Sequence, residues 1–239
     1  MDIQELDYDV KKIVKPKIWD TYFYVNYSLR KTYEKIFHEF LNDKSPLSLL
    51  DFGCGVKPYQ FILNKYCNKY IGIDVVENPK ADIIIDPDTK LPVGDDEFDI
   101  VLSSQVLEHV NNVSQYLNEC YRILKKDGIL FISTHGTWQY HSSPVDVQRW
   151  TSYGLKNLIE RHNFKIKKFV PVLGQLALTS QLRLTFYDSF ANMIGIVGKI
   201  LLIPISFCYQ IKMFLEDFIT PQRVKDRDSA VFIVVAIKK

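Results

Sequence analysis

Hydrophobic and polar positions along this chain follow two patterns, which alternate from one segment to the next. Short apolar runs bounded by turn residues predict strands, whereas apolar residues three or four positions apart predict helices. The expected strands are 47–52, 70–75, 81–86, 98–105, 128–134, 166–172 and 229–237. The expected helices are one or two within 18–41, then 57–66, 113–125 and 152–163. Strands that alternate with helices predict an α/β fold with right-handed βαβ units and a mostly parallel sheet.

The helix at 113–125 has the clearest pattern. Val113, Leu117, Cys120 and Leu124 share one face. Lys125 and Lys126 follow at the end where the helix dipole favours cations, and Gly128 then supplies a stop signal.

Two segments lie outside the alternation. Residues 1–45 form an N-terminal helical extension that precedes an α/β domain over residues 46–239. Residues 174–220 form an apolar helical insert before the last strand, for which three roles stay open: a lid over the site, a homodimer face, or a peripheral contact with a membrane. Lys199 and Pro204 interrupt its most apolar stretch, and a lysine at mid-membrane costs roughly 2.5–3.5 kcal/mol. We therefore expect no transmembrane helix.

Composition narrows the classes further. The formal net charge of +2 and the scattered lysines predict no nucleic-acid partner. Four cysteines without a C-x-x-C pair predict reduced thiols and no zinc site. The N-terminus is acidic and polar, which does not match a signal peptide. We expect a cytoplasmic protein, peripheral to a membrane if the insert docks there.

The stretch LLDFGCGVKPY, residues 49–59, ends the first expected strand of the sheet in a turn with two glycines. An open α/β sheet binds its ligand at this edge. Pro58 stands where a dinucleotide fingerprint has its third glycine, which weakens a pyrophosphate site. Asp74 ends the next strand about 20 residues later, where a carboxylate can accept both ribose hydroxyls. A tight turn and a turn-capping aspartate are the alternative interpretations.

Taken together, DFGCG, GID, LP-x(5)-FDIVLSSQVLEHV and RILKKDGILFIST resemble the class I S-adenosylmethionine-dependent methyltransferases over residues 49 to about 169. GCG-x-K-P-Y and HSSPVDVQRWTSYGL are similar to the branch associated with sugar and polysaccharide biosynthesis. The resemblance implies a Rossmann-like, seven-stranded mixed sheet with the last strand antiparallel and helices on both faces. It also implies S-adenosylmethionine as the cofactor, which has no pyrophosphate and so depends less on the missing glycine.

The resemblance places the cofactor at the ends of the first, second and fourth strands. The cofactor-binding residues it implies are Asp51, Gly53, Cys54, Gly55, Asp74, Val75, Asp86, Ser103, Ser104 and Gln105. Gly53 and Gly55 let the backbone approach the ligand because they lack Cβ. The spacing from Asp86 to the LP pair is one residue longer than the family pattern.

The acceptor is expected over the loop that follows the fifth strand. His135, Trp138, Tyr140 and Arg149 are the candidate substrate-binding residues of that loop. His141 or His135 is a candidate general base near neutral pH, and Asp146 orients such a histidine or itself acts as base. A salt bridge between Asp146 and Arg149 that only organises the loop is the alternative. For His109 a structural role is preferred.

These residues predict a methyltransferase that moves a methyl group onto an oxygen, such as a sugar hydroxyl of a glycan, glycolipid or related small molecule. No residue cluster calls for a metal. Two other classes stay open. An NAD-dependent or nucleotide-sugar oxidoreductase would have its glycine motif nearer the N-terminus and would keep the third glycine. A catalytically silent binding or scaffold subunit would share the fold.

Overall fold

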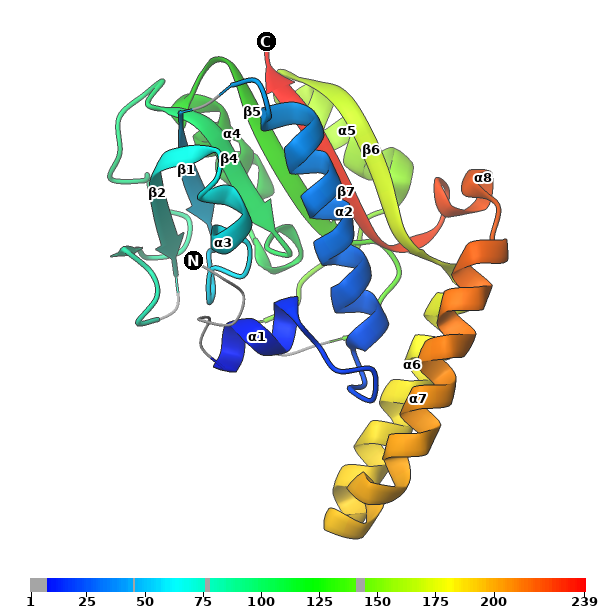
Figure 1. Ribbon diagram of the computed structural model, residues 1–239. Helices are drawn as coiled ribbons and strands as arrows, with labels where there is room; N and C mark the ends of the chain where they lie inside the picture. Colours follow the sequence, from blue (N-terminus) through cyan, green and yellow to red (C-terminus); the bar gives the residue numbers. More distant parts are fainter. Residues whose placement is uncertain (1–7, 45, 76–77, 141–144) are drawn as a thin grey trace.

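A seven-stranded mixed sheet forms the centre of the molecule. The computed structural model describes residues 8–44, 46–75, 78–140 and 145–239 (Figure 1). The strands are β1 (Leu47–Phe52), β2 (Cys67–Asp74), β3 (Ile83–Ile84), β4 (Phe98–Ser104), β5 (Leu124–His135), β6 (Phe164–Gly174) and β7 (Ser229–Lys238). Their order is β3-β2-β1-β4-β5-β7-β6, and β7 is antiparallel to both of its neighbours. The fold class predicted from the sequence is confirmed.

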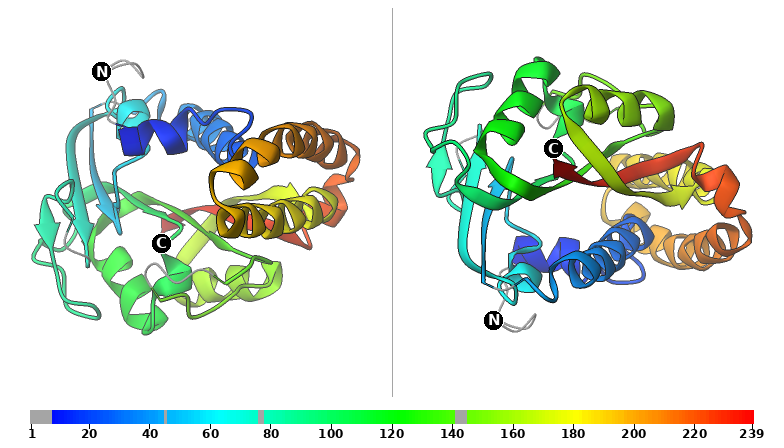
Figure 2. Two further views of the ribbon diagram at one scale, coloured as in Figure 1. Left: turned by 90° about the horizontal axis from the view of Figure 1, so that it is seen from below. Right: turned by 90° about the horizontal axis from the view of Figure 1, so that it is seen from above.

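Helices cover both faces of the sheet (Figure 2). They are α1 (Tyr8–Val14), α2 (Phe23–Leu41), α3 (Gln60–Leu63), α4 (Val113–Ile123), α5 (Ser152–Arg161), α6 (Gln175–Ile194), α7 (Ile196–Ile219) and α8 (Gln222–Lys225), with a 3₁₀ turn at Leu107–His109. One apolar core joins α2 to the sheet, and a second core joins α4 and α5 to the opposite face. Tyr33, Phe37 and Leu41 of α2 are fully buried, so the segment before residue 46 shares the core of the domain that follows it.

Three expected elements have different bounds in the structure. The helix expected at 57–66 is only the short α3. The strand expected at 81–86 is only β3, because the chain there lies at the sheet edge with one partner strand. The helix at 113–125 ends at Ile123, and Lys125 and Lys126 belong to β5. Leu124 already pairs with Phe98 of β4, and Lys125 Nζ binds both oxygens of Asp99 at 2.9 Å, so the lysines do not cap the helix.

The insert at 174–220 forms a helical hairpin, α6 and α7, joined at Gly195. It starts at Gly174, the end of β6, and the chain returns to the sheet at Ser229 of β7. Since β6 is parallel to β5, the hairpin leaves the same edge at which β1, β2, β4 and β5 end. Figure 1 shows it projecting past that edge and away from the sheet. A lid would cover the strand ends, and most of the length of the hairpin does not.

Candidate active site

The turn after β1 is built around two glycines in left-handed conformations. Gly53 has φ +76° and Gly55 has φ +49°, values that favour glycine. The backbone N–H groups of Gly53 and Cys54 both donate to the carbonyl of Ile73, at 2.8 and 3.0 Å, which ties the turn to β2. A Cβ on Gly53 would lie 2.5 Å from Val106, whereas a Cβ on Gly55 would meet nothing within 4 Å. The turn is therefore closed beneath Gly53 and open beside Gly55.

Asp74 lies directly against this turn. Its carboxylate accepts the N–H of Gly55 at 2.9 Å and that of Val75 at 2.8 Å. The Asn78 amide donates to the same carboxylate at 3.3 Å and also to the carbonyl of Gly55. A carboxylate only accepts hydrogen bonds, which is the chemistry that ribose hydroxyls need in a partner. The structure thus brings together the glycine turn and the acid that the sequence assigned to the ribose.

Asp51 and Cys54 lie beneath the turn. Both are almost completely buried, at 2% exposure. Burial raises the pKa of Asp51 to about 7, although a hydrogen bond from the Tyr70 hydroxyl and the charge of Lys57 act in the opposite direction. Burial likewise raises the pKa of the Cys54 thiol to about 12. Neither side chain reaches the open side at Gly55, so both support the turn from below in this structure.

Lys57 braces the same turn from the edge of the sheet. Its ammonium lies 2.6 Å from Asp82, and its stem passes over Gly72, where a Cβ would come within 2.3 Å of Lys57 Cε. Asp82 also accepts the N–H of Gly72 at 2.7 Å. Partial burial would raise the pKa of Asp82, but these hydrogen bonds and the lysine charge lower it below its ordinary value.

The end of β4 contributes polar groups at the centre of the same edge. Gln105 has φ +57° and its side-chain amide donates to the Ser133 hydroxyl at 2.7 Å. Ser104 Oγ lies 3.5 Å from the same hydroxyl. Ser103 is fully buried and accepts the Tyr116 hydroxyl at 2.8 Å, so it faces α4 and not the strand ends.

Val75 and Asp86 lie on the outer side of β2. Val75 is 40% exposed directly after Asp74. Asp86 is exposed beyond the end of β3, and its carbonyl accepts the Thr89 hydroxyl at 2.7 Å. Ile84 of β3 pairs with Asp74, so Asp86 is two residues further along the chain at the same edge.

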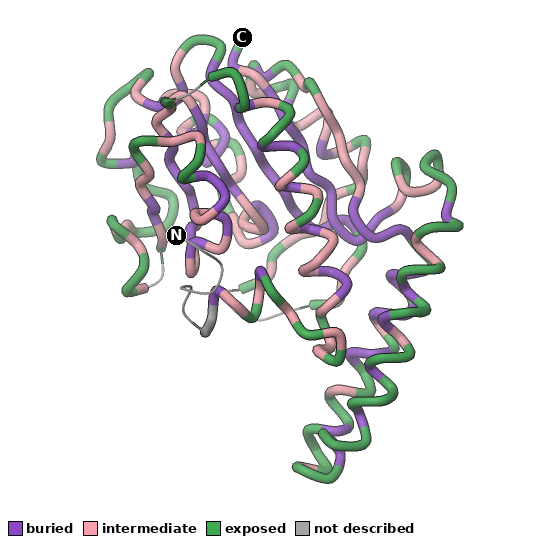
Figure 3. The backbone as a smooth tube through the Cα atoms, in the orientation of Figure 1, coloured by how far each residue is buried: buried purple, intermediate pink, exposed green. Residues whose placement is uncertain are grey.

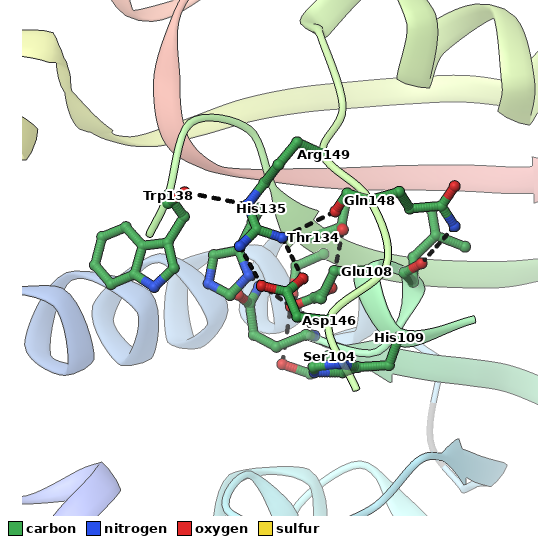
Figure 4. A network of polar contacts seen from close by, with 12 residues as sticks. Ser104, Glu108, His109, Thr134, His135, Trp138, Asp146, Gln148 and Arg149 are labelled. Carbon is green, nitrogen blue, oxygen red and sulfur yellow. Dashed lines mark hydrogen bonds and ion pairs between the residues drawn. The ribbon is translucent and has the colours of Figure 1, made fainter. Parts of the chain in front are cut away.

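A buried acid and a histidine meet at the end of β5 (Figure 4). Nδ1 of His135 lies 2.8 Å from Oε1 of Glu108, and the Thr134 hydroxyl donates to Oε2 at 2.9 Å. The His135 ring stacks on Trp138 with centroids 5.3 Å apart. Burial would raise the pKa of Glu108, but the contacts with His135 and Thr134 lower it below its ordinary value. Nδ1 of His135 thus faces the ionised Glu108 in a close charge contact, without hydrogen-bond geometry between the two atoms.

Arg149 and Asp146 hold the loop over this pair. The guanidinium donates to both carboxylate oxygens of Asp146, and it also donates to the carbonyls of Gln139 at 2.7 Å and Gln148 at 2.9 Å. The Asp146 side chain is 1% exposed. This is the loop-organising salt bridge that the sequence left open as an alternative, and it commits both side chains to each other.

The other loop residues are arranged less closely. Tyr140 is 68% exposed, whereas Trp138 packs against the core that contains α2. Nδ1 of His109 lies 3.1 Å from the carbonyl of Val145, which agrees with the structural role preferred for it. His141, a candidate general base, lies outside the described residues.

A hollow of about 210 Å³ lies behind the loop, between the end of β5 and the start of β7. Arg149, Trp150, Arg227 and Asp228 line it. No residue of the glycine turn contributes to its wall. Within the part of the chain that the structure describes, no group of histidine, cysteine, aspartate and glutamate side chains is placed to hold a metal ion.

Comparison with known proteins supports this interpretation of the strand ends. Residues 50–132 match the model of a methyltransferase domain family. A probable S-adenosylmethionine-dependent methyltransferase of Mycolicibacterium smegmatis is 24% identical over 59% of this chain and 61% of its own length. The mitochondrial ubiquinone biosynthesis O-methyltransferase of Rattus norvegicus is 35% identical over 38% of this chain and 31% of its own length. This chain therefore spans less than two thirds of these curated relatives.

Solved structures show the same fold. The 1,6-didemethyltoxoflavin-N1-methyltransferase of Burkholderia thailandensis, a structure with bound S-adenosylhomocysteine, has a TM-score of 0.56 and 16% identity. The superposition covers 89% of this chain and 79% of that one. The fold and the match of residues 50–132 to a methyltransferase domain family support a class I S-adenosylmethionine-dependent methyltransferase.

Sequence reasoning missed four residues of the site. Glu108, Thr134, Lys57 and Asn78 were not singled out, although Glu108 contacts His135, Asn78 donates to Asp74, Thr134 donates to Glu108 and Lys57 pairs with Asp82 beside the turn. Glu108 carried a usable signal, because an acid that directly follows an apolar run at a strand end is rarely buried without a partner. Asn78 carried none, since its bond to Gly55 joins positions far apart in sequence.

Proposed function

We propose that this protein is an S-adenosylmethionine-dependent methyltransferase that methylates an oxygen, with a sugar hydroxyl of a glycan, glycolipid or related small molecule as the acceptor. The observation that carries the proposal is one edge of the sheet with two sets of groups. The turn at Gly55 and the Asp74 carboxylate stand at the ends of β1 and β2, and the Glu108–His135 pair stands at the ends of β4 and β5.

The residues at the first set fit the cofactor. Gly55 leaves open space beside the backbone, and the Asp74 carboxylate is anchored next to it. We assign the amino-acid end of the cofactor to the turn and its ribose hydroxyls to Asp74. When bound, S-adenosylmethionine supplies a methyl group on a sulfonium, which is reactive without further activation. What the chain must add is alignment of the acceptor, which is worth roughly 7–11 kcal/mol in favourable cases.

The second set can manage the acceptor's proton. Nδ1 of His135 faces Glu108, and we assign Nε2, the other ring nitrogen, as the acceptor of the hydroxyl proton. S-Adenosylmethionine, held by Asp74 and the turn at Gly55, would supply the methyl group to the acceptor oxygen and would keep the electron pair of its carbon–sulfur bond. The hydroxyl proton then passes to His135. Glu108 acts as a positioning residue, and its charge stabilises the protonated ring.

The acceptor class rests on the motif of the loop and on the presence of a base. An oxygen acceptor needs its proton removed, and His135 with Glu108 provides for that step. Trp138, one of the candidate substrate-binding residues, stacks on the same histidine. Matched relatives and neighbours include both an O-methyltransferase and an N-methyltransferase by name, so their names do not select the acceptor atom.

The test has two stages. Calorimetry should show binding of S-adenosylmethionine and S-adenosylhomocysteine and no binding of NAD. Incubation with S-adenosylmethionine labelled in the methyl group and extracts of the source cells should then move label into a product that releases methyl sugars on hydrolysis. Binding of NAD in place of S-adenosylmethionine would overturn the class. Label found only on amines or carbon would overturn the acceptor.

A further inference from the structure

Among the described residues, the exposed large apolar side chains are concentrated on the α6–α7 hairpin. Figure 3 shows most of its outer half as exposed. The exposed large apolar side chains in its outer half are Phe186, Phe190, Met193, Ile194, Ile196, Val197, Ile200, Leu201, Ile203, Ile205 and Phe207. Met193 and Ile196, at the tip, are 84% and 72% exposed. Contiguous apolar surface of this extent marks an interaction site.

The exposed residues surround the helix pair instead of forming one stripe. On α7 only the face of Gly198, Leu202, Ser206, Gln210 and Met213 is buried, and it packs against α6. Every other face of α7 from Ile196 to Phe207 presents apolar side chains, apart from Lys199. A helix whose exposed sides are all apolar is suited to an apolar solvent that surrounds it.

Charges are few beyond the base of the hairpin, and Asp188 and Lys199 are the two charged residues between Phe186 and Ile211. From Ser189 to Ile211 the sequence has a single charged residue, Lys199. At the base, Lys212 pairs with Glu216 and also donates to Ser180 of α6. Asp217 lies 3.1 Å from Lys225 and accepts the N–H of Gly174 at 2.7 Å. The polar groups at the base thus face the protein, while the outer half has almost none.

The base of the hairpin is fixed to the rest of the domain. The Gln210 amide accepts the N–H of Tyr24 at 3.1 Å and donates to the carbonyl of Asp20 at 2.9 Å. Gln181 donates to the carbonyl of Thr21 at 3.1 Å. The hairpin therefore projects at a defined angle, on the side of the sheet at which β1, β2, β4 and β5 end (Figures 1 and 2).

The chain segment that holds this base carries groups suited to a membrane surface. Lys11, Lys12, Lys15 and Lys17 lie within seven residues of one another, and Trp19 is 47% exposed with Lys17 Nζ 5.6 Å from its ring centre. Tryptophan is enriched at membrane interfaces, and lysines near the surface are attracted to anionic lipids.

We propose that the α6–α7 hairpin embeds its tip and the outer face of α7 in one leaflet of a lipid bilayer. The helix α7 is long and apolar enough to cross a membrane by length and composition, and only 28% of its most apolar window is buried. Its uncharged part from Ile200 to Ile211 rises about 17 Å. Since the hydrocarbon core is about 30 Å thick, this length matches one leaflet and not the whole bilayer.

A bilayer fits this surface better than a second copy of the chain. A twofold dimer uses one patch on each partner, so it would leave the opposite side of each hairpin in water. The apolar residues on the sides of α7 and at the tip would then stay exposed. Lipid contacts all of these sides at once.

The inference deepens the proposed function, on which this step rests. With the hairpin embedded, the edge that carries Gly55, Asp74 and His135 faces the membrane surface. An acceptor that reaches this edge is then an amphiphile, with its sugar at the surface and its apolar tail in the same leaflet. A lipid-linked glycan has this chemistry.

Flotation with phosphatidylcholine vesicles, with and without phosphatidylglycerol, tests the membrane contact. The double variant Ile200→Asp, Leu201→Asp should lower partition into vesicles by about 100-fold or more, because carboxylates enter hydrocarbon poorly. Lys199→Leu should raise partition by about 10-fold or more, since it removes the charge nearest the tip. Tyr153→Asp is the matched control, as Tyr153 is 74% exposed on α5, and it should leave partition unchanged. Vesicles with phosphatidylglycerol should bind the native chain more tightly.

A depth measurement separates insertion from surface attachment. In a Cys208→Ser background, Met193→Cys labelled with an environment-sensitive dye reports on the tip, and Cys208 labelled in the native chain reports on the middle of α7. A lipid-borne quencher should reduce the tip signal more strongly. Equal quenching at positions 193 and 208 would overturn insertion. Insertion would also be overturned if neither the Ile200→Asp, Leu201→Asp variant nor Lys199→Leu changed partition into vesicles.

Sedimentation and cofactor binding identify the cause of a failure. A native dimer in solution that the Ile200→Asp, Leu201→Asp variant converts to a monomer, with no flotation of either, would assign the surface to a second copy and overturn the proposal. S-Adenosylmethionine affinity should be the same in all hairpin variants. If the native chain floats but does not bind S-adenosylmethionine, the proposed function fails while the membrane contact stands, and the amphiphilic acceptor falls with the function.

Discussion

The glycine turn after β1 and the helical hairpin after β6 leave the same edge of the sheet, yet they are stabilised in opposite ways. In the turn, nearly every polar group has a partner within a few residues of Gly53 or Asp74, and the parts beneath it are buried. In the hairpin, polar contacts are limited to the base and the outer half exposes apolar side chains. The polar groups of the turn have their partners within the chain itself, whereas the exposed apolar side chains of the hairpin need an apolar environment outside it.

This difference assigns separate tasks to the two regions. The turn and Asp74 define where the cofactor lies, and the hairpin defines what lies opposite the strand ends. The Glu108–His135 pair stands between them, at the end of β5. Changes in the turn should therefore alter cofactor affinity alone, changes in the hairpin should alter membrane partition alone, and changes in the pair should alter turnover alone.

The largest effect is expected at His135. His135→Ala should lower turnover by roughly 10²–10⁴-fold with S-adenosylmethionine affinity nearly unchanged, because the variant loses the group that accepts the proton. Glu108→Gln should give a smaller loss and shift the pH profile of turnover, since the ring loses its charged partner. The measurement is transfer of labelled methyl to the cell extract, with His38→Ala, an exposed change on α2, as the control. Full activity in His135→Ala would return the role of base to His141.

How much of this site the sequence could predict differs between the same two regions. The turn was predicted residue by residue, because Gly53, Gly55 and Asp74 follow strand ends whose apolar pattern is local. The Glu108–His135 contact was not predicted, since it joins residues 27 positions apart through the pairing of β4 with β5. The exposure of the hairpin was also not predicted. Its pattern resembles that of a buried helix, and sequence alone does not say whether protein or lipid supplies the apolar partner.

The fold shows the same division. Strand existence and the mixed sheet followed from periodicity. The end of α4 did not, because Lys125 and Lys126 are good residues for a helix end, but tertiary pairing of Leu124 with Phe98 starts β5 there. Residues 1–45 were expected as an extension, yet α2 buries Tyr33 and Phe37 in the core of the sheet. An amphipathic pattern predicts that one face of a helix is buried, but it does not predict which element that face packs against.

The second prediction concerns the buried acid beneath the turn. Since the pKa of Asp51 is raised to about 7, the folded protein keeps a proton that the unfolded chain loses near pH 4. Stability should therefore be highest below about pH 4 as far as this group is concerned, fall between about pH 4 and 7, and level off above pH 7. Three pKa steps correspond to a change of up to about 4 kcal/mol.

Asp51→Asn isolates this contribution, because the amide oxygen can still accept the Tyr70 hydroxyl. The difference in urea unfolding free energy between variant and native protein should grow in favour of the variant from pH 4 to 7. Parallel pH profiles would show that Asp51 is ionised in the fold, with Lys57 as its counter-charge. Cofactor affinity should change little, since Asp51 does not reach the open side of the turn.

The third prediction is a loss of cofactor affinity in Asp74→Ala. A hydrogen bond to a charged group contributes about 1.5–3 kcal/mol, so removal of the carboxylate should weaken S-adenosylmethionine by about 10- to 100-fold. Asp43→Ala, an exposed aspartate after α2, is the control for charge. Calorimetry that gives the same affinity for Asp74→Ala and native protein would remove Asp74 from the cofactor site. Partition into vesicles should be the same in both variants.

The smallest effect, and the sharpest comparison of the two regions, comes from a matched pair of glycines. Gly55 in the turn has φ +49° and Gly195 at the hairpin tip has φ +83°, and a Cβ added at either would meet nothing within 4 Å. Alanine at each position should therefore cost only backbone strain, about 1–2 kcal/mol of unfolding free energy for a left-handed residue such as Gly55 and more at Gly195, whose ψ of −144° favours glycine strongly. Both variants should be destabilised in urea, Gly195→Ala the more.

Their binding properties should also differ. The space beside Gly55 is where the cofactor approaches the backbone in the proposed site, so Gly55→Ala should lower S-adenosylmethionine affinity because its methyl group occupies that space. Gly195→Ala should leave this affinity unchanged, since the hairpin tip lies away from the strand ends. Calorimetry on both variants decides the point. If Gly55→Ala binds S-adenosylmethionine as tightly as Gly195→Ala, the open side of the turn is not the cofactor's place, and Gly55 serves only the geometry of the turn.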